Sequence, residues 1–123
     1  MTPAPGKRRI YLFGPMSGIP EFNFPAFNEA AKILRGLGHQ VINPAELDDP
    51  DHQPGSMPWA WYLARDLREM LTCDTLVALP GWRRSKGARL EHHVGAELGK
   101  DIYELAEFIE LHHPDLQEAT IAG

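Results

Sequence analysis

The sequence has little cysteine and no long apolar run, and each shortage excludes a class of protein. Cys73 is the one cysteine among 123 residues, which excludes a disulfide framework and a cysteine-based zinc site. No run approaches the roughly 20 apolar residues of a membrane-spanning helix. The polar, proline-rich start lacks the apolar core of a signal peptide, so we expect a cytoplasmic domain without membrane contacts. The net charge of −5 argues against binding of nucleic acid polymers.

Common nucleotide-binding and metal-binding motifs are missing too. No G-x-G-x-x-G sequence follows the first apolar run, and Gly14 and Gly18 do not belong to a P-loop because no Gly-Lys-Ser/Thr comes after them. The histidine pairs 92–93 and 112–113 are adjacent in sequence. Neighbours on a helix point about 100° apart, so neither pair can share one ion. We therefore expect neither a metal ion nor a cofactor.

Short apolar runs alternate with stretches of helical periodicity. The runs predict strands at 9–13, 40–43, 75–79 and 101–104, and the periodic stretches predict helices at about 26–37, 58–71, 85–98 and 105–112. This alternation predicts an α/β fold with a mainly parallel sheet of four to five strands and helices on both faces. We expect one domain at 9–113, a disordered or extended segment at 1–8, and a tail at 114–123.

The apolar spacing also predicts which helical residues are buried. In the second helix, which we expect Ser56 to cap and Pro58 to begin, the stripe is Ala60, Leu63, Ala64, Leu67, Met70 and Leu71. In the third helix it is Ala88, Leu90, Val94 and Leu98. Residues 45–58, rich in Asp and Pro, predict a long surface loop that is either a plain connector or a lid over a site.

The segment after the third strand carries an unusual concentration of positive charge. Parallel sheets bind ligands outside the carboxyl ends of their strands, so loops 14–24 and 80–87 are the first places to look. Four basic side chains lie near the start of the third helix: Arg83, Arg84, Lys86 and Arg89. They form either a solvated loop or an anion site, in which N–H groups near Ser85 and Gly87 would face the ligand.

Three carboxylates are candidates for chemistry or for structure. Glu91, one turn into the third helix, should be held ionised by the positive charge and the helix terminus. It could then attack a sugar carbon, although a helical glutamate is more often a surface residue. Asp66 borders the buried face of the second helix, and the alternative is an ion pair with Arg65 or Arg68. Asp74 directly precedes a strand, so we interpret it as a turn or capping residue.

Five blocks in order resemble the nucleoside 2-deoxyribosyltransferase superfamily, in particular its small members. The blocks span about residues 9–104 and are IYLFGPMSG at 10–18, GHQVINP at 38–44, RD at 65–66 with CDTLVA at 73–78, GARLEHHVGA at 87–96 and LGK at 98–100. The resemblance implies a flavodoxin-like (Rossmann-like) fold and cleavage of an N-glycosidic bond. In this family's pattern, Glu91 matches the nucleophile that attacks the anomeric carbon. Tyr11 matches the hydroxyl that orients it, and Asp66 the acid that helps to protonate the leaving base.

The resemblance also implies a substrate class. Ser85 stands six positions before Glu91, where members acting on free nucleosides carry an acid and members hydrolysing nucleoside 5′-monophosphates carry a serine. A hydroxyl donates to a phosphate, whereas a carboxylate would repel it. We therefore expect a nucleotide or nucleoside as the ligand, bound by Gly14, Ser17, Gly18, Phe24, Ser85 and Gly87, with arginines around the phosphate.

The remaining expectations concern the base, the acceptor and the assembly. One or two of Phe22, Phe24, Trp59, Trp61 and Trp82 could sandwich the base, the others being core or subunit contacts. We favour hydrolysis over deoxyribosyl transfer, because residues 119–123 show no counterpart of the C-terminal side chain that classical members receive from a neighbouring subunit. We expect a homodimer or a higher homo-oligomer. A non-catalytic nucleotide-binding or sensing domain and a structural dimerisation domain are the alternatives.

Overall fold

The computed structural model describes residues 6–47, 51–53 and 55–115; most of the predicted N-terminal segment and tail lies outside this part. Its strands are β1 (Arg9–Phe13), β2 (Gln40–Ile42), β3 (Thr75–Ala78) and β4 (Asp101–Glu104). Its helices are α1 (Phe24–Gly36), α2 (Trp59–Met70), α3 (Lys86–Glu97) and α4 (Leu105–His112), and short 3-10 helices occupy Pro20–Asn23, Pro44–Glu46 and Trp82–Arg84. No helix of the described ranges is long and apolar enough to cross a membrane.

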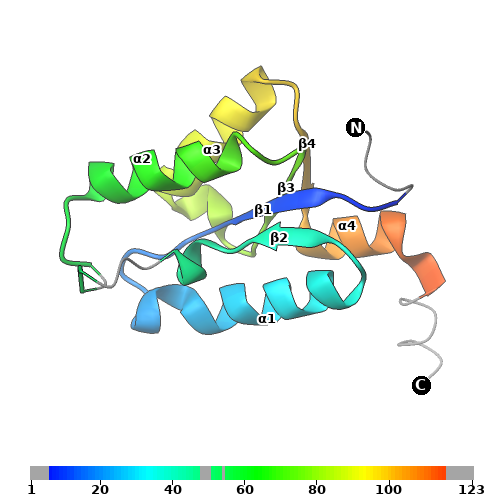
Figure 1. Ribbon diagram of the computed structural model, residues 1–123, viewed down its shortest axis with the longest axis horizontal. Coiled ribbons are helices and arrows are strands. Elements are labelled where there is room, and N and C mark those ends of the chain that lie inside the picture. Colours follow the sequence, from blue (N-terminus) through cyan, green and yellow to red (C-terminus); the bar gives the residue numbers. More distant parts are fainter. Residues whose placement is uncertain (1–5, 48–50, 54, 116–123) are drawn as a thin grey trace.

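The four strands form one parallel sheet in the order β2-β1-β3-β4 (Figure 1). Ile10 of β1 pairs with Val41 on one side and with Thr75 on the other. The chain therefore reverses its direction across the sheet at β1, and the switch point between β1 and β3 is where this kind of sheet binds ligands. The predicted flavodoxin-like α/β fold is confirmed.

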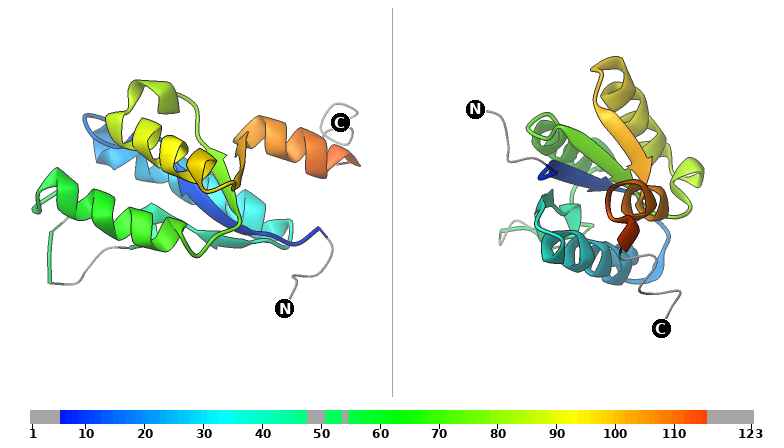
Figure 2. Two further views of the ribbon diagram at one scale, coloured as in Figure 1. Left: turned by 90° about the horizontal axis from the view of Figure 1, so that it is seen from above. Right: turned by 90° about the vertical axis from the view of Figure 1, so that its right-hand side faces the viewer.

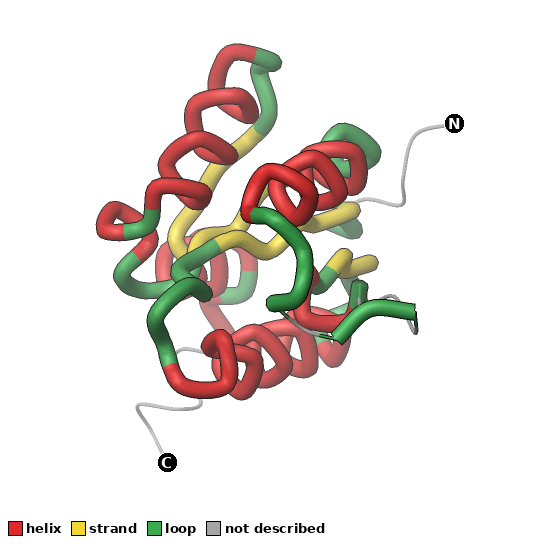
Figure 3. The backbone as a smooth tube through the Cα atoms, turned by 90° about the vertical axis from the view of Figure 1, so that its left-hand side faces the viewer, coloured by secondary structure: helices red, strands yellow, loops and turns green. Residues whose placement is uncertain are grey.

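Helices cover both faces of the sheet (Figure 2). Successive side chains of a strand point to opposite faces. Ile10 and Leu12 accordingly belong to the core beneath α1 and α4, whereas Tyr11 and Phe13 belong to the core beneath α2 and α3. All four are at most 1% exposed, because β1 is one of the two inner strands of the sheet. Figure 3 shows the yellow strands enclosed by the red helices, with the loops in green.

The predicted stripe of α2 is confirmed for Met70 and for Leu67, which packs partly buried against the core, and it is wrong for half of its residues. Met70 is the one fully buried residue of this helix, while Ala60, Ala64 and Leu71 are exposed. The reason is that the amino-terminal half of α2 borders a cavity rather than the sheet. Ser56 is not its cap either, because the helix begins at Trp59 without a side-chain cap.

The predicted inner face of α3 needs a similar correction. Leu90 is 38% and Leu98 53% exposed, and the buried residues are Ala88, Glu91 and Gly95. These three share one face because they stand three and four residues apart. A Cβ at position 95 would lie only 2.6 Å from Leu76 Cδ2, so glycine lets α3 approach β3 closely.

Candidate active site

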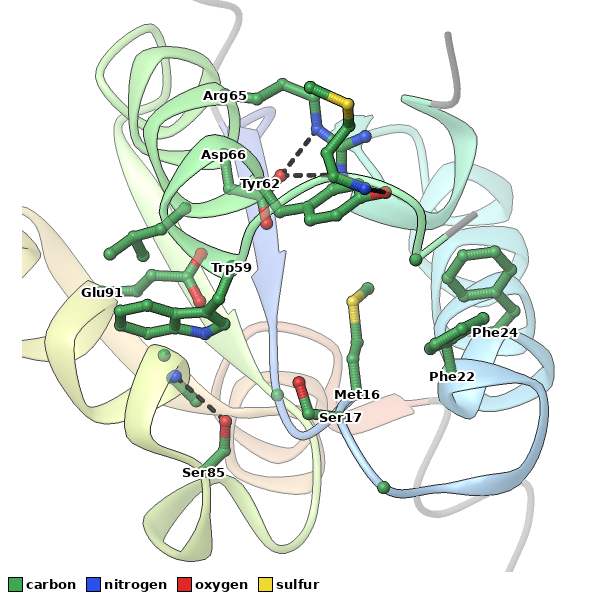
Figure 4. Close-up of a pocket in the computed structure, with 17 residues that line it drawn as sticks. Met16, Ser17, Phe22, Phe24, Trp59, Tyr62, Arg65, Asp66, Ser85 and Glu91 are labelled. Carbon is green, nitrogen blue, oxygen red and sulfur yellow. Dashed lines mark hydrogen bonds and ion pairs between the residues drawn. The ribbon is translucent and has the colours of Figure 1, made fainter. Parts of the chain in front are cut away.

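A cavity of about 320 Å³ opens at the switch point, between the loop after β1 and the first turns of α2 and α3 (Figure 4). This volume falls at the lower end of the range of small-molecule sites. Of the predicted site residues, the following line it: Gly14, Ser17, Gly18, Phe24, Asp66, Ser85, Gly87 and Glu91. Tyr11 stands behind the cavity, fully buried, and reaches it through Glu91. The structure thus brings the predicted residues together, while their roles stay predictions.

Glu91 forms the buried end of the cavity. Its side chain is 6% exposed, and its Oε2 accepts a hydrogen bond from the Tyr11 hydroxyl over 2.5 Å. Burial raises the pKa of Glu91 to about 8, although the Tyr11 hydrogen bond lowers it, and the charge of Asp66 raises it further. The expectation that Glu91 is held ionised is therefore wrong for the unliganded protein near neutral pH, since loss of solvation outweighs the helix terminus.

Tyr11 is the donor in its hydrogen bond with Glu91. Burial and the neighbouring carboxyls of Glu91 and Asp66 raise the pKa of Tyr11 well above its ordinary value. The phenol consequently keeps its proton throughout the physiological range. It can hold one Glu91 oxygen in place and stabilise the charge of that carboxylate.

Asp66 faces the same cavity from α2. Its carboxyl forms an ion pair with Arg65 at 3.0 Å and is 14% exposed. Burial raises the pKa of Asp66 to about 6, against the opposing effect of Arg65. Asp66 therefore fits both interpretations at once: it forms an ion pair with Arg65 and it also lines the cavity, where it is a candidate for chemistry. Arg68 is bonded to the Ala64 carbonyl instead.

The first turn of α3 supplies a wall with anion-binding character. Ser85 caps the helix, its Oγ accepting a hydrogen bond from the Ala88 N–H over 3.2 Å. That leaves the Ser85 O–H available as a donor. Ser17 and Gly18, from the loop after β1, line the cavity together with it, and Figure 4 shows the labelled Ser17 and Ser85 side chains beside the same opening.

The predicted ring of arginines is wrong. Arg83 forms an ion pair with Glu104 at 3.0 Å, and Arg89 donates to the Arg83 carbonyl over 2.9 Å. Arg83 thus points toward Glu104 of β4, and none of Arg83, Arg84 and Arg89 lines the cavity. Lys86 stays near the rim, with its Nζ 4.5 Å from the Trp59 ring centre. Among the described residues, Arg65 is the basic side chain that lines the cavity.

The aromatic candidates divide between the cavity and the rest of the fold. Phe22, Phe24 and Trp59 line the cavity. Trp82 stacks on His92 instead, with ring centres 4.5 Å apart. Trp61 packs on Tyr62.

The sequence analysis left several lining residues unassigned to the cavity: Met16, Gly55, Met57, Tyr62, Leu63, Arg65 and Ala88. Gly55 and Met57 belong to segment 45–58, so this segment is more than a connector. The Met57 N–H donates to the Tyr62 hydroxyl over 3.1 Å, which ties the segment to α2. Tyr62 could have been found from its position four residues before Asp66 on one helix face. Asp74, as predicted, is structural, since its Oδ2 accepts the Arg9 N–H over 3.1 Å.

Comparisons with known proteins identify a family and two similar structures. Residues 8–104 match the model of a domain of unknown function (DUF4406), and no curated protein sequence matches. The structure is similar to a 2-deoxyribosyltransferase from the psychrotolerant bacterium Bacillus psychrosaccharolyticus, with a TM-score of 0.62 and 26% identity, over 78% of this chain and 70% of that one.

A second solved structure shows the same fold. It is a 2-desoxiribosyltransferase from Leishmania mexicana, with a TM-score of 0.58 and 20% identity. The match covers 79% of this chain and 63% of that one. The chain therefore belongs to the DUF4406 family, which is related to the nucleoside 2-deoxyribosyltransferases.

Proposed function

We propose that this domain cleaves the N-glycosidic bond of a (deoxy)nucleoside 5′-monophosphate through a covalent ester between the sugar and Glu91. The observation that carries the proposal is the convergence of the Tyr11–Glu91 pair and Asp66 on one cavity. A carboxylate nucleophile and a second carboxyl that can donate a proton are the two groups that double displacement at an anomeric carbon requires.

In the first step, the ionised Glu91 carboxylate attacks C1′ of the sugar. The C1′–N bond breaks, and its electron pair goes to the departing nitrogen of the base. Asp66 gives its proton to the base, so the base leaves neutral and Asp66 becomes a carboxylate. Tyr11 holds the attacking carboxyl and keeps its own proton.

In the second step, water attacks C1′ and gives a proton to the Asp66 carboxylate. The bond between C1′ and the Glu91 oxygen breaks, and its electron pair restores the Glu91 carboxylate. We propose water as the acceptor. A second base in place of water would give deoxyribosyl transfer, the activity for which both structural neighbours are named.

The 5′-phosphate is assigned to the start of α3. A helix of 12 residues carries partial positive charge at its amino terminus. The Ser85 hydroxyl accepts from the Ala88 N–H there and donates to no group in the described part of the chain. Gly87 keeps this wall open, because its nearest side-chain neighbour is Trp59 at 3.7 Å from an added Cβ. Phe22, Phe24 and Trp59 offer apolar faces for the base.

The two carboxyls hold one proton between them from about pH 6 to about pH 8, the pKa values of Asp66 and Glu91, and this proton lies mostly on Glu91. The reactive form, with Glu91 ionised and the proton on Asp66, is the minor one of the two one-proton forms. At lower pH a second proton neutralises both carboxyls, and at higher pH the last proton is lost, so the reactive form is depleted on both sides. The proposed mechanism therefore predicts a bell-shaped pH dependence of kcat/KM with its maximum near neutrality.

The experiment is to incubate the protein with nucleosides and 5′-monophosphates and to separate liberated bases by chromatography. We expect base release from monophosphates, and a loss of at least about 100-fold in Glu91→Gln. Glu97→Gln is the matched control, because Glu97 is exposed on the same helix. The remaining product separates the acceptors: a sugar phosphate indicates hydrolysis, and a new nucleotide in the presence of a second base indicates transfer.

Calorimetry on the same mixtures tests the alternative of a nucleotide sensor. Heat of binding without any free base would contradict the proposed catalysis and favour the sensor. Base release at an undiminished rate in Glu91→Gln would contradict the assignment of the nucleophile.

A further inference from the structure

Arg65 is held in one orientation by three kinds of contact. Its Nε and Nη2 lie 3.1 and 3.0 Å from Asp66 Oδ1, and its Nη1 donates to the Leu47 carbonyl over 3.0 Å. The guanidinium also lies over two rings, 5.8 Å from the centre of Trp61 and 5.3 Å from that of Tyr62. The guanidinium plane is thus fixed on the side of Asp66 that faces away from Glu91 (Figure 4).

Both Arg65 contacts go to the same Asp66 oxygen. Oδ1 accepts a hydrogen bond from the Arg65 Nε–H and also lies 3.0 Å from Arg65 Nη2, whereas Oδ2 has no hydrogen-bond partner within the part of the chain that the structure describes. A proton on Oδ1 would compete with the Arg65 Nε–H for the lone pairs of that oxygen and would face the positive guanidinium. When Asp66 is protonated, the proton therefore sits on Oδ2, the oxygen free to face the cavity.

We propose that Arg65 is a positioning residue that fixes the acidic proton of Asp66 on Oδ2 and thereby aims it at the departing base. The inference rests on the proposed function and adds a residue to it. In this account Arg65 touches neither the sugar nor the base during the reaction. It acts by deciding which oxygen of Asp66 is the donor.

The electrostatic effect of Arg65 makes it possible to separate the proposal from the simplest alternative, in which Arg65 merely keeps Asp66 charged. Its positive charge lowers the pKa of Asp66, while burial raises it. Without Arg65 the carboxyl would hold its proton more tightly, so more of the acid would be present at neutral pH. If base departure nevertheless slows, the loss must lie in the placement of the proton and not in its supply.

The test uses Arg65→Met, with Arg68→Met as the matched control, because Arg68 is exposed on the same helix and, among the residues that the structure describes, is hydrogen-bonded to the Ala64 carbonyl alone. The first readout is the pKa of the Asp66 carboxyl by carbon-13 NMR titration. The second is kcat for a natural monophosphate and for a 4-nitrophenyl glycoside 5′-phosphate, whose leaving group departs without a proton.

For Arg65→Met we expect a higher pKa of Asp66 and base release slower by about 10- to 100-fold, with nitrophenolate release within about threefold of wild type. Arg68→Met should change none of these quantities. Equal slowing of both substrates would overturn the inference, as would unchanged base release or an unchanged titration of Asp66.

Arg65→Lys guards against a variant that fails to fold. Lysine keeps the charge but lacks the planar fork that contacts Asp66 and Leu47 together, so base release should stay at least about fivefold below wild type while nitrophenolate release is normal. Full recovery with lysine would contradict the inference. A wild-type protein that releases no base contradicts the proposed function instead, and the Asp66 titration then still decides where Arg65 acts.

Discussion

Replacing Tyr11 with phenylalanine removes one oxygen and keeps the buried ring, so it isolates the hydrogen bond to Glu91. That hydrogen bond spans 2.5 Å between two buried side chains. A hydrogen bond to a charged group contributes about 1.5–3 kcal/mol, and about 1.4 kcal/mol corresponds to one pKa unit. The pKa of Glu91, about 8 in the wild-type protein, should therefore rise by about one to two units in Tyr11→Phe.

This rise gives Tyr11→Phe a distinct pH signature. Below about pH 8 Glu91 is mostly protonated in both proteins, so kcat/KM should be lower by about 10- to 100-fold in the variant, in proportion to the ionised fraction. Above the raised pKa the carboxyl is ionised in both proteins, and the two profiles should converge. Asp66 loses its proton in both proteins alike, so the ratio of the two rates isolates Glu91.

The assay is kcat/KM for base release from a 5′-monophosphate, measured between about pH 5 and about pH 10.5 for both proteins. Tyr103→Phe is the control, because Tyr103 packs on Phe108 and His112 and does not line the proposed site. A deficit of equal size at every pH would refute the electrostatic role of Tyr11 and leave only a steric one. No deficit at any pH would refute both.

Three further predictions test substrate choice, stability and packing. Ser85→Asp places a carboxylate at the proposed phosphate wall and should reduce kcat/KM for monophosphates at least about 10-fold more than for free nucleosides, measured on paired substrates. Burial and neighbouring positive charge lower the pKa values of His39 and His112 below their ordinary 6.5. The folded state therefore binds protons less readily than the unfolded state. In urea titrations, the free energy of unfolding should decrease as the pH is lowered from about 6.5. Gly95→Ala should lower that free energy by about 1–3 kcal/mol, because its Cβ would meet Leu76 at 2.6 Å; an unchanged urea midpoint would contradict this reading of the packing.

The strands could be predicted because the apolar runs and the glycine and proline residues that end them indicate the same boundaries. Gly14, Pro44 and Pro80 follow apolar runs in the sequence, and the observed strands lie within one residue of the predicted ones. A short apolar run is enough to predict a buried strand. The alternation of strands and helices then predicts that the strands are parallel.

Helical burial was harder to predict because the cavity replaces part of the core. An apolar stripe assigns Leu90 to the inside of α3, whereas the structure turns Glu91 inward and leaves Leu90 38% exposed. Apolar periodicity does not predict the burial of a carboxyl. The position of Glu91 near the start of the third helix made it one of three candidates, and the resemblance to known enzymes then matched it to the nucleophile. A residue that breaks the stripe yet is buried beside a cavity is a signature of function rather than of stability.

The direction of the basic cluster could not be predicted from its spacing. Trp82 packs against Phe13 and stacks on His92, and this tertiary contact turns Arg83 toward Glu104. Local sequence shows four charges in one place but not which side of the helix terminus they occupy. The cytoplasmic location, the homo-oligomer and the roles of the site residues stay predictions.

The covalent ester on Glu91 is the central claim, and intact-mass spectrometry tests it most directly. Fluorine at C2′ of the sugar of a 5′-monophosphate destabilises the positively charged transition states of both steps. A leaving group that departs more readily than a natural base keeps the first step faster than the second, so the intermediate accumulates. We predict that the wild-type protein gains the mass of one sugar phosphate residue, that peptide mapping places it on Glu91, and that Glu91→Gln gains none. A label on another residue, or base release by the wild-type protein that Glu91→Gln retains in full, would contradict the account.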